Sequence, residues 1–130
     1  MISFFVPGRP APQGSKRHVG RGILIESSKE VGPWRERVAL AAHSHAKTVL
    51  AGPVGVRLDF VMPRPKSAPK LSTPPAIKRP DIDKTTRAVL DALTGICFAD
   101  DSQVVDLRAT KRLALPEETP GVHITIGDSE

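Results

Sequence analysis

The sequence predicts an α+β fold: a single two-layer domain in which a mixed β-sheet is packed by two main helices. The chain has 130 residues, which suffices for one domain with a modest core. Segments that alternate like strands are intermixed with segments of helical periodicity, without a repeated strand–helix–strand series. Hydrophobic residues make up 39% of the chain, an ordinary share that argues against wholesale disorder.

The first half of the chain predicts two strands and a helix. Residues 1–8 read as an opening strand, and residues 22–27 as a short second one. Residues 32–52 follow helical periodicity, with Pro33 in the first turn and Gly52 at the exit. The residues expected on the buried face of this helix are Trp34, Val38, Ala41, Ala42 and Val49.

The second half predicts three strands and a second helix. Residues 55–63 alternate apolar and charged side chains, as in a half-buried strand. Residues 85–95 predict the clearest helix, because Asp83 can cap its start and Gly95 can close it. The remaining predicted strands are residues 103–113 and residues 121–128.

Positive charge is concentrated in two basic loops, at residues 8–21 and 63–80. The net charge of +5 favours an anionic partner, nucleic acid before acidic lipid. Neither loop contains an acidic residue. Six of the thirteen prolines lie in residues 63–80, which excludes a helix or a central strand there. This segment is either a tolerated linker or an arm that follows a phosphate backbone.

Several classes of protein are disfavoured by composition. Aromatic residues make up only 4%, too few for a base-stacking platform. The single cysteine, Cys97, excludes an intramolecular disulfide and a cysteine-based zinc site, and its apolar neighbours predict a small buried residue. The N-terminus shows neither a signal peptide nor a membrane span, so we expect a cytoplasmic protein that does not enter membranes.

Acidic residues gather in one short span of this basic chain. They are Asp81, Asp83, Asp91, Asp100 and Asp101. If residues 81–83 are extended, Asp81 and Asp83 project to one side and Ile82 anchors in the core. Asp100 and Asp101 directly precede the strand predicted from residue 103. If that strand neighbours the extended residues 81–83, one carboxylate of this pair meets Asp81 and Asp83.

Three carboxylates in contact repel one another, and a divalent cation relieves the repulsion. Carboxylate oxygens suit Mg²⁺ or Mn²⁺, and such ions beside a phosphate-binding surface commonly serve phosphodiester hydrolysis. Taken singly, the acids have simpler explanations. Asp83 can be a helix cap, Asp91 an ion-pair partner of Arg87, and Asp100-Asp101 a turn.

The segment "PDIDKTTRAVLDALTG", followed closely by "FADDSQVVD", resembles the RusA family of Holliday junction resolvases, which includes phage-borne members. The resemblance is firm over residues 78–108 and looser elsewhere. It implies a small homodimeric endonuclease of DNA recombination and repair. Such an enzyme cuts four-way DNA junctions symmetrically in the presence of Mg²⁺ or Mn²⁺.

The resemblance also assigns residues by position. The essential carboxylates fall on Asp81, Asp83 and Asp101, with Asp100 as a neighbouring metal ligand. The family's catalytic lysine falls on Arg87, which can stabilise a phosphate's charge but cannot lose a proton at neutral pH. The DNA-binding residues expected in and beside the basic loops are Lys16, Arg17, Arg21, Lys78, Arg79 and Lys84.

One other function stays open at this point, and a second is disfavoured. The arginine at the lysine position is compatible with a non-catalytic module that binds DNA junctions. A nuclease of the Pro-Asp…(Asp/Glu)-x-Lys type would need a lysine two residues after the second acid, and Gln103 occupies that position after Asp101.

Overall fold

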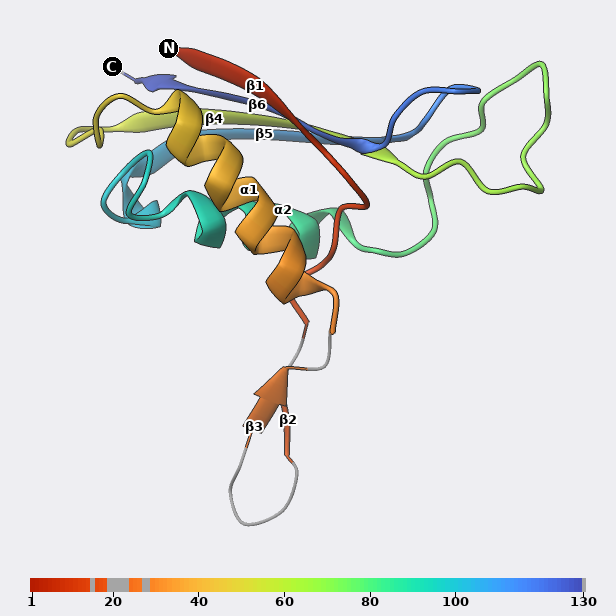
Figure 1. The fold of residues 1–130 in the computed structure, drawn as a ribbon, viewed down its shortest axis with the longest axis horizontal. Coiled ribbons are helices and arrows are strands. Elements are labelled where there is room, and N and C mark those ends of the chain that lie inside the picture. The colour runs from red at the N-terminus through yellow and green to blue at the C-terminus, as the bar shows by residue number, and fades with distance from the viewer. Residues whose placement is uncertain (15, 19–23, 27–28, 130) are drawn as a thin grey trace.

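The protein folds as two layers, a four-stranded sheet with both helices on one face (Figure 1). The computed structural model describes residues 1–14, 16–18, 24–26 and 29–129. The strands of this sheet are β1 (Ile2–Pro7), β4 (Val54–Met62), β5 (Val104–Leu113) and β6 (Gly121–Asp128), in the order β1-β6-β4-β5. Only β4 and β5 are parallel, so the sheet is mixed as predicted and the α+β domain is confirmed.

The helices are α1 (Val31–His45) and α2 (Ile82–Leu93). Because β4 and β5 are parallel, the chain must cross the sheet between them, and α2 lies in that crossover. Thr86, Val89 and Leu93 of α2 are buried, on the shared face that the sequence predicted. Within the described ranges, neither helix is long and apolar enough to span a bilayer.

The core lies between the sheet and the helices. On β4, Val56, Leu58 and Phe60 are buried while Arg57 is exposed, as the alternation predicted. Cys97 is 1% exposed, also as predicted, and burial raises the pKa of its thiol. The largest fully buried side chains are Phe60, Phe98, Leu58, Leu93, Ile124 and Ile126.

The first helix is shorter than the predicted residues 32–52. It ends at His45, and the chain then becomes extended at Ala46. Leu50 donates a main-chain hydrogen bond of 2.9 Å to the carbonyl of Cys97, so tertiary pairing replaces the last predicted turns. Val49, expected on the buried face, is 50% exposed for this reason.

A separate two-stranded sheet precedes α1. It pairs β2 (Lys16–His18) with β3 (Leu24–Glu26) in antiparallel register (Figure 1). The sequence predicted the second of these strands but assigned the first to a loop, because three consecutive basic residues carry no strand signal. In contrast, residues 63–80 contain neither helix nor strand, as their prolines predicted.

Candidate active site

The acidic span begins at the start of α2, and this helix starts before the predicted residues 85–95. Asp81 is extended and occupies the N-cap, but Ile82 is already helical, so the predicted extended run over residues 81–83 is wrong. Pro80 supports this start, since a proline cannot lie inside a helix. Ile82 is 37% exposed and does not anchor in the core. Asp83 lies in the first turn rather than at the cap.

The first turn of α2 is fixed by Thr85. The main-chain N–H of Thr85 donates to the carbonyl of Asp81 at 3.1 Å, and its hydroxyl donates to the carbonyl of Ile82 at 3.0 Å. Thr85 is fully buried. This orientation leaves Asp83 and Arg87, one helical turn apart, on the side away from the core.

The second acidic segment is a short 3₁₀ turn, Asp101–Gln103, in front of β5. The Asp100 carboxylate accepts from the main-chain N–H of Ser102 at 2.9 Å. The Gln103 amide oxygen accepts from the main-chain N–H groups of Ala99 and Asp100 at 2.8 and 2.9 Å. This arrangement is a capping box, and it fixes the two aspartates.

The amide nitrogen of Gln103 ties this turn to the rest of the protein. It donates to the carbonyls of Leu50 and Gly52, each at 2.9 Å. The sequence interpretation gave Gln103 no role, although Asp-x-x-Gln from residue 100 is a recognisable capping-box pattern. Gln103 therefore sets where Asp101 lies relative to the sheet.

Asp83, Arg87 and Asp101 line one open hollow between α2 and β5, of about 490 Å³, which we call the acidic hollow. Its other walls are Ile82, Thr86, Leu90, Leu107 and Ala109. The structure thus brings together one aspartate from each of the two predicted segments, with the arginine beside them.

The Asp101 carboxylate lies close to two other acidic side chains, Asp100 and Asp91. Burial, then the hydrogen bond shared with Asp100, then the charges of Asp100 and Asp91 raise the pKa of Asp101. The main-chain and side-chain hydrogen bonds from Ser102, followed by the one from Asp101, lower the pKa of Asp100. Asp91 itself lies 3.8 Å from Arg35 of α1, rather than in the considered pair with Arg87. A cation in the acidic hollow would relieve this repulsion.

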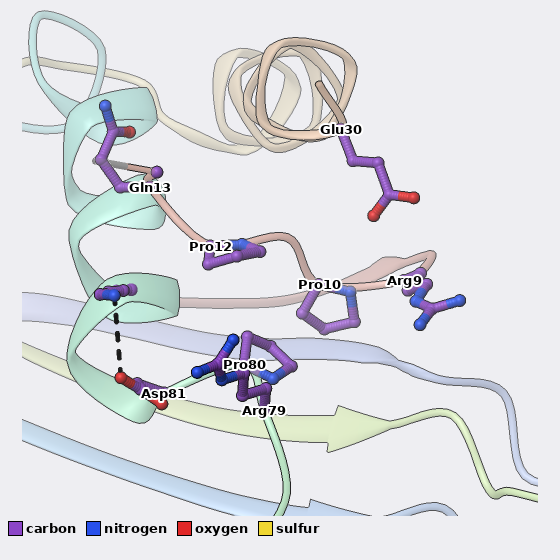
Figure 2. A pocket seen from close by; sticks show the side chains of 10 residues that line it. Arg9, Pro10, Pro12, Gln13, Glu30, Arg79, Pro80 and Asp81 are labelled. Atoms are coloured by element: carbon purple, nitrogen blue, oxygen red, sulfur yellow. Dashed lines mark ion pairs between the residues drawn. The ribbon is translucent and has the colours of Figure 1, made fainter. Parts of the chain in front are cut away.

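Asp81 lies in a different hollow, on the other side of the same helix end. This basic hollow, of about 500 Å³, is lined by Arg9, Arg79 and Lys84 together with Asp81 and Glu30. The ammonium of Lys84 lies 3.9 Å from the Asp81 carboxylate (Figure 2). Figure 2 shows Arg79 and Pro80 close to Asp81, with Arg9 and Glu30 farther along the hollow.

The three predicted carboxylates do not form one cluster. Among the residues that the structure describes, no three His, Cys, Asp or Glu side chains lie close enough together to hold one ion. The expected meeting of Asp81 with Asp83 and Asp101 is therefore not seen, because the helix turns between residues 81 and 83. Ligation of a metal by all three stays a prediction.

The predicted DNA-binding residues are spread over three regions. Lys78 and Arg79 end the second basic loop, and Lys84 lies in the first turn of α2. Lys16 and Arg17 belong to β2, whereas Arg21 lies outside the described residues. Arg9 was not singled out as a DNA-binding residue. Its position next to prolines in an acid-free loop was the available signal.

The family follows from comparison with known proteins. Residues 7–127 match the sequence profile described as endodeoxyribonuclease RusA. This chain belongs to the RusA family. The uncharacterized protein YqaN of Bacillus subtilis (strain 168) is 33% identical to it over 138 aligned positions, covering 96% of this chain and 94% of YqaN.

Membership confirms the resemblance drawn from the aspartate segments. It implies endonuclease activity of the Holliday junction resolvase type, on branched DNA. RusA resolvases generally depend on a divalent metal. The donor set of the acidic hollow fits such an ion, because carboxylate oxygens are the hard ligands that these cations prefer. Burial, followed by the effects of Asp100 and Asp91, raises the pKa of Asp101, and a bound cation would favour its charged form.

Proposed function

We propose that this protein is a Mg²⁺-dependent endonuclease that resolves Holliday junctions by paired, symmetric phosphodiester hydrolysis in DNA recombination and repair. Mn²⁺ is the alternative cation. The observation that carries the proposal is the acidic hollow, where Asp83, Arg87 and Asp101 meet in a member of the RusA family. We infer that it acts in the cytoplasm, where DNA is accessible.

Asp83 and Asp101 are the proposed metal ligands on opposite walls of the acidic hollow, with Asp100 beside them. Asp81 is the proposed third essential carboxylate. It reaches the same ion only if its side chain turns away from Lys84, which the weak 3.9 Å pair allows. When bound, the metal would supply an activated water and a counter-charge for the leaving oxygen.

Arg87 supports the scissile phosphate in this proposal. It lines the acidic hollow one turn after Asp83, so its guanidinium and the carboxylates face the same space. A guanidinium stays protonated at neutral pH and forms two parallel hydrogen bonds to phosphate oxygens. Its role is therefore to stabilise charge, not to transfer a proton.

The basic hollow holds a phosphate next to the cut. Arg79 and Lys84 line it beside Asp81, at the positive end of α2. Lys78, Lys16, Arg17 and Arg21 extend the proposed phosphate contacts along the two basic loops. Such contacts position DNA without reading its sequence.

A homodimer is the proposed assembly. A four-way junction has two-fold symmetry, and paired cuts need two active sites. On the edge strand β5, Val105 is 63% exposed and does not line the acidic hollow, so it gives a second copy apolar surface to cover outside that site. Sedimentation of the protein alone tests this: a dimer mass is expected, and a monomer at micromolar concentration would contradict it.

The nuclease proposal is tested with a synthetic four-way junction and Mg²⁺. Asp83→Asn keeps the shape of the side chain but removes its charge, and we expect cleavage to fall more than about 100-fold. The matched control is Asp106→Asn, because Asp106 is exposed on β5 and pairs with Arg108 at 3.7 Å, outside the acidic hollow. Equal cutting by wild type and Asp83→Asn would remove the proposed site. Asp81→Asn tests the third ligand in the same assay.

Arg87, at the position of the family's catalytic lysine, favours a second candidate function: binding of DNA junctions without cleavage. That module would bind the junction with an affinity that falls with salt, yet leave every strand intact with Mg²⁺ or Mn²⁺. If wild-type protein nicks the junction near its branch point and Asp83→Asn does not, the protein is an enzyme and not a binding module.

A further inference from the structure

The second basic loop folds back on itself to form a third concave surface, of about 390 Å³, which we call the proline groove. In Figure 1 this segment is the green excursion beyond the end of the sheet. The apolar walls of the groove include Pro65, Ala68, Pro69, Pro74, Ile77 and Leu113. Three cations, Arg9, Lys78 and Arg79, also line it, and no acidic residue does.

Arg64 holds the loop in this shape. Its guanidinium donates to the hydroxyl of Thr73 at 2.9 Å and to the carbonyl of Ala114 at 3.1 Å. It also donates to the carbonyls of Ser72, at 2.6 Å, and Pro69. One side chain therefore connects the tip of the loop to the end of β5.

Lys111 holds the other end of the loop. Its ammonium, on the face of β5 that carries Leu113, donates to the carbonyls of Lys78 at 3.0 Å and Pro80 at 2.8 Å. The proline groove is thus built before any ligand arrives, as most small-ligand sites are. The stiff proline rings add to this, because they lose little conformational entropy on binding.

The proline groove adjoins the basic hollow. Arg9, Arg79 and Pro80 line both of them. A phosphate held between Arg9 and Arg79 would therefore place the adjoining nucleotide at the mouth of the groove. The cationic surface of the basic hollow gives way there to the apolar walls of the groove. This order matches a nucleotide, whose anionic phosphate is followed by a largely apolar base.

We propose that the proline groove receives an unstacked nucleobase of the DNA strand held in the basic hollow. This inference rests on the proposed junction binding, and it adds a base-accepting site beside the cut. The charge at the mouth favours a polyanion over a neutral or basic peptide. Ile77 is 85% exposed in the free protein, so a base lying against it would bury apolar surface that now faces water.

The test uses 2-aminopurine, placed at one position at a time around the branch point of a four-way junction. Binding is measured in EDTA, so that no strand is cut whether or not the protein is a nuclease. The fluorescence of this base increases when it leaves the stack. We expect an increase at one position close to the cut when wild-type protein binds.

Three variants relate that signal to the proline groove. Ala68→Phe fills the groove and should abolish the increase. Leu71→Phe is its control, because Leu71 is 101% exposed and is not a wall of the groove. Ile77→Ala shortens an exposed wall, so folding is preserved even if Ala68→Phe does not fold. It should weaken binding about five-fold, equivalent to about 1 kcal/mol of lost apolar contact.

The outcomes separate this inference from the nuclease proposal. Junction cleavage without increased fluorescence at any position would overturn the proline groove as a base site and leave the enzyme intact. An increase that persists in a folded Ala68→Phe variant would also overturn it. An increase that disappears in that variant supports the site even if Mg²⁺ produces no cleavage, in which case the nuclease proposal alone fails.

Discussion

The acidic hollow and the basic hollow flank the same turn of α2, yet they carry opposite charge. One presents Asp83 and Asp101, where burial and then the neighbouring acids Asp100 and Asp91 raise the pKa of Asp101. The other presents Arg9, Arg79 and Lys84. The first is suited to a cation and the second to a phosphate. Two acids only two residues apart, Asp81 and Asp83, lie in different hollows because the helix begins between them.

The opposite charges of the two hollows indicate that the proposed bond cleavage and the proposed phosphate binding use separate surfaces. The acidic hollow is assembled by α2, the Asp101–Gln103 turn and β5. The basic hollow is assembled by the first basic loop and the chain that enters α2. Substitutions in one should therefore change the rate of cutting, and substitutions in the other should change affinity.

The largest effect is expected from Asp101→Asn. Removing this charge takes away a proposed metal ligand, so single-turnover cleavage of a four-way junction should fall more than about 100-fold. Junction affinity in EDTA should stay the same or improve, because the variant loses negative charge near DNA. A parallel loss of affinity would show that the two hollows do not act separately.

Lys111→Met should come next. The variant keeps the length of the side chain but loses both hydrogen bonds to the main chain just before Asp81. We expect a cleavage rate about 10- to 100-fold lower at saturating protein, because misplacement of a catalytic group by about 1 Å has effects of this size.

Two matched variants distinguish positioning by Lys111 from a simple charge effect. Lys66→Met removes the same charge from an exposed position in the second basic loop and should cut normally. Lys111→Arg retains donors for the two carbonyls and should recover part of the rate. Equal losses in Lys111→Met and Lys66→Met would contradict the positioning role.

Arg9→Gln probes the basic hollow with a smaller effect. Losing one phosphate contact should weaken junction binding about ten-fold and reduce the slope of log affinity against log salt by about 1. Cleavage at saturating protein should be unchanged, since Arg9 does not line the acidic hollow. Binding titrations at several salt concentrations measure both quantities.

The smallest effect is expected far from both hollows, at Glu118. Two hydrogen bonds with Arg112, at 2.6 and 2.7 Å, followed by the main-chain N–H of Leu115, lower the pKa of Glu118 from 4.5 to about 2. Its lowered pKa means that the pair stabilises the fold above pH 4.5. That contribution is lost as pH falls from 4.5 towards 2.

Glu118→Gln should therefore lower the free energy of unfolding by about 1 kcal/mol or less at pH 7, because the pair is partly exposed. The difference from wild type should vanish near pH 2. Urea denaturation at both pH values measures it. A difference that grows on acidification would contradict the stated direction of the pKa shift.

The sequence predicted the sheet and both helices, because period-2 and helical patterns fix which faces are buried. It also expected Asp83 near Asp101, but through an extended run over residues 81–83 where the structure has helix. It placed Asp81 incorrectly, since the choice between extended and helical backbone at residues 81–83 depends on packing. Thr85 and Thr86 are buried against the core, and their burial favours the helical backbone. Threonine is exposed in most proteins, so the sequence alone does not predict that these two are buried.

The residues that organise the site were the hardest to predict. Arg64 and Lys111 act through main-chain carbonyls of a loop without regular structure, and no spacing rule identifies such partners. Gln103 was identifiable only in part. The capping-box pattern predicts its contact with Asp100, whereas its bonds to Leu50 and Gly52 depend on the tertiary path of the chain.

The buried thiol has a practical consequence for following the protein at work. Cys97 is the chain's only cysteine, and its low exposure and raised pKa leave it unreactive towards maleimide dyes. A cysteine introduced at fully exposed Leu71 would therefore take a fluorophore at that one position, without first replacing the native residue. Energy transfer to dyes on the arms of a junction would then report, one molecule at a time, how this loop moves as DNA arrives.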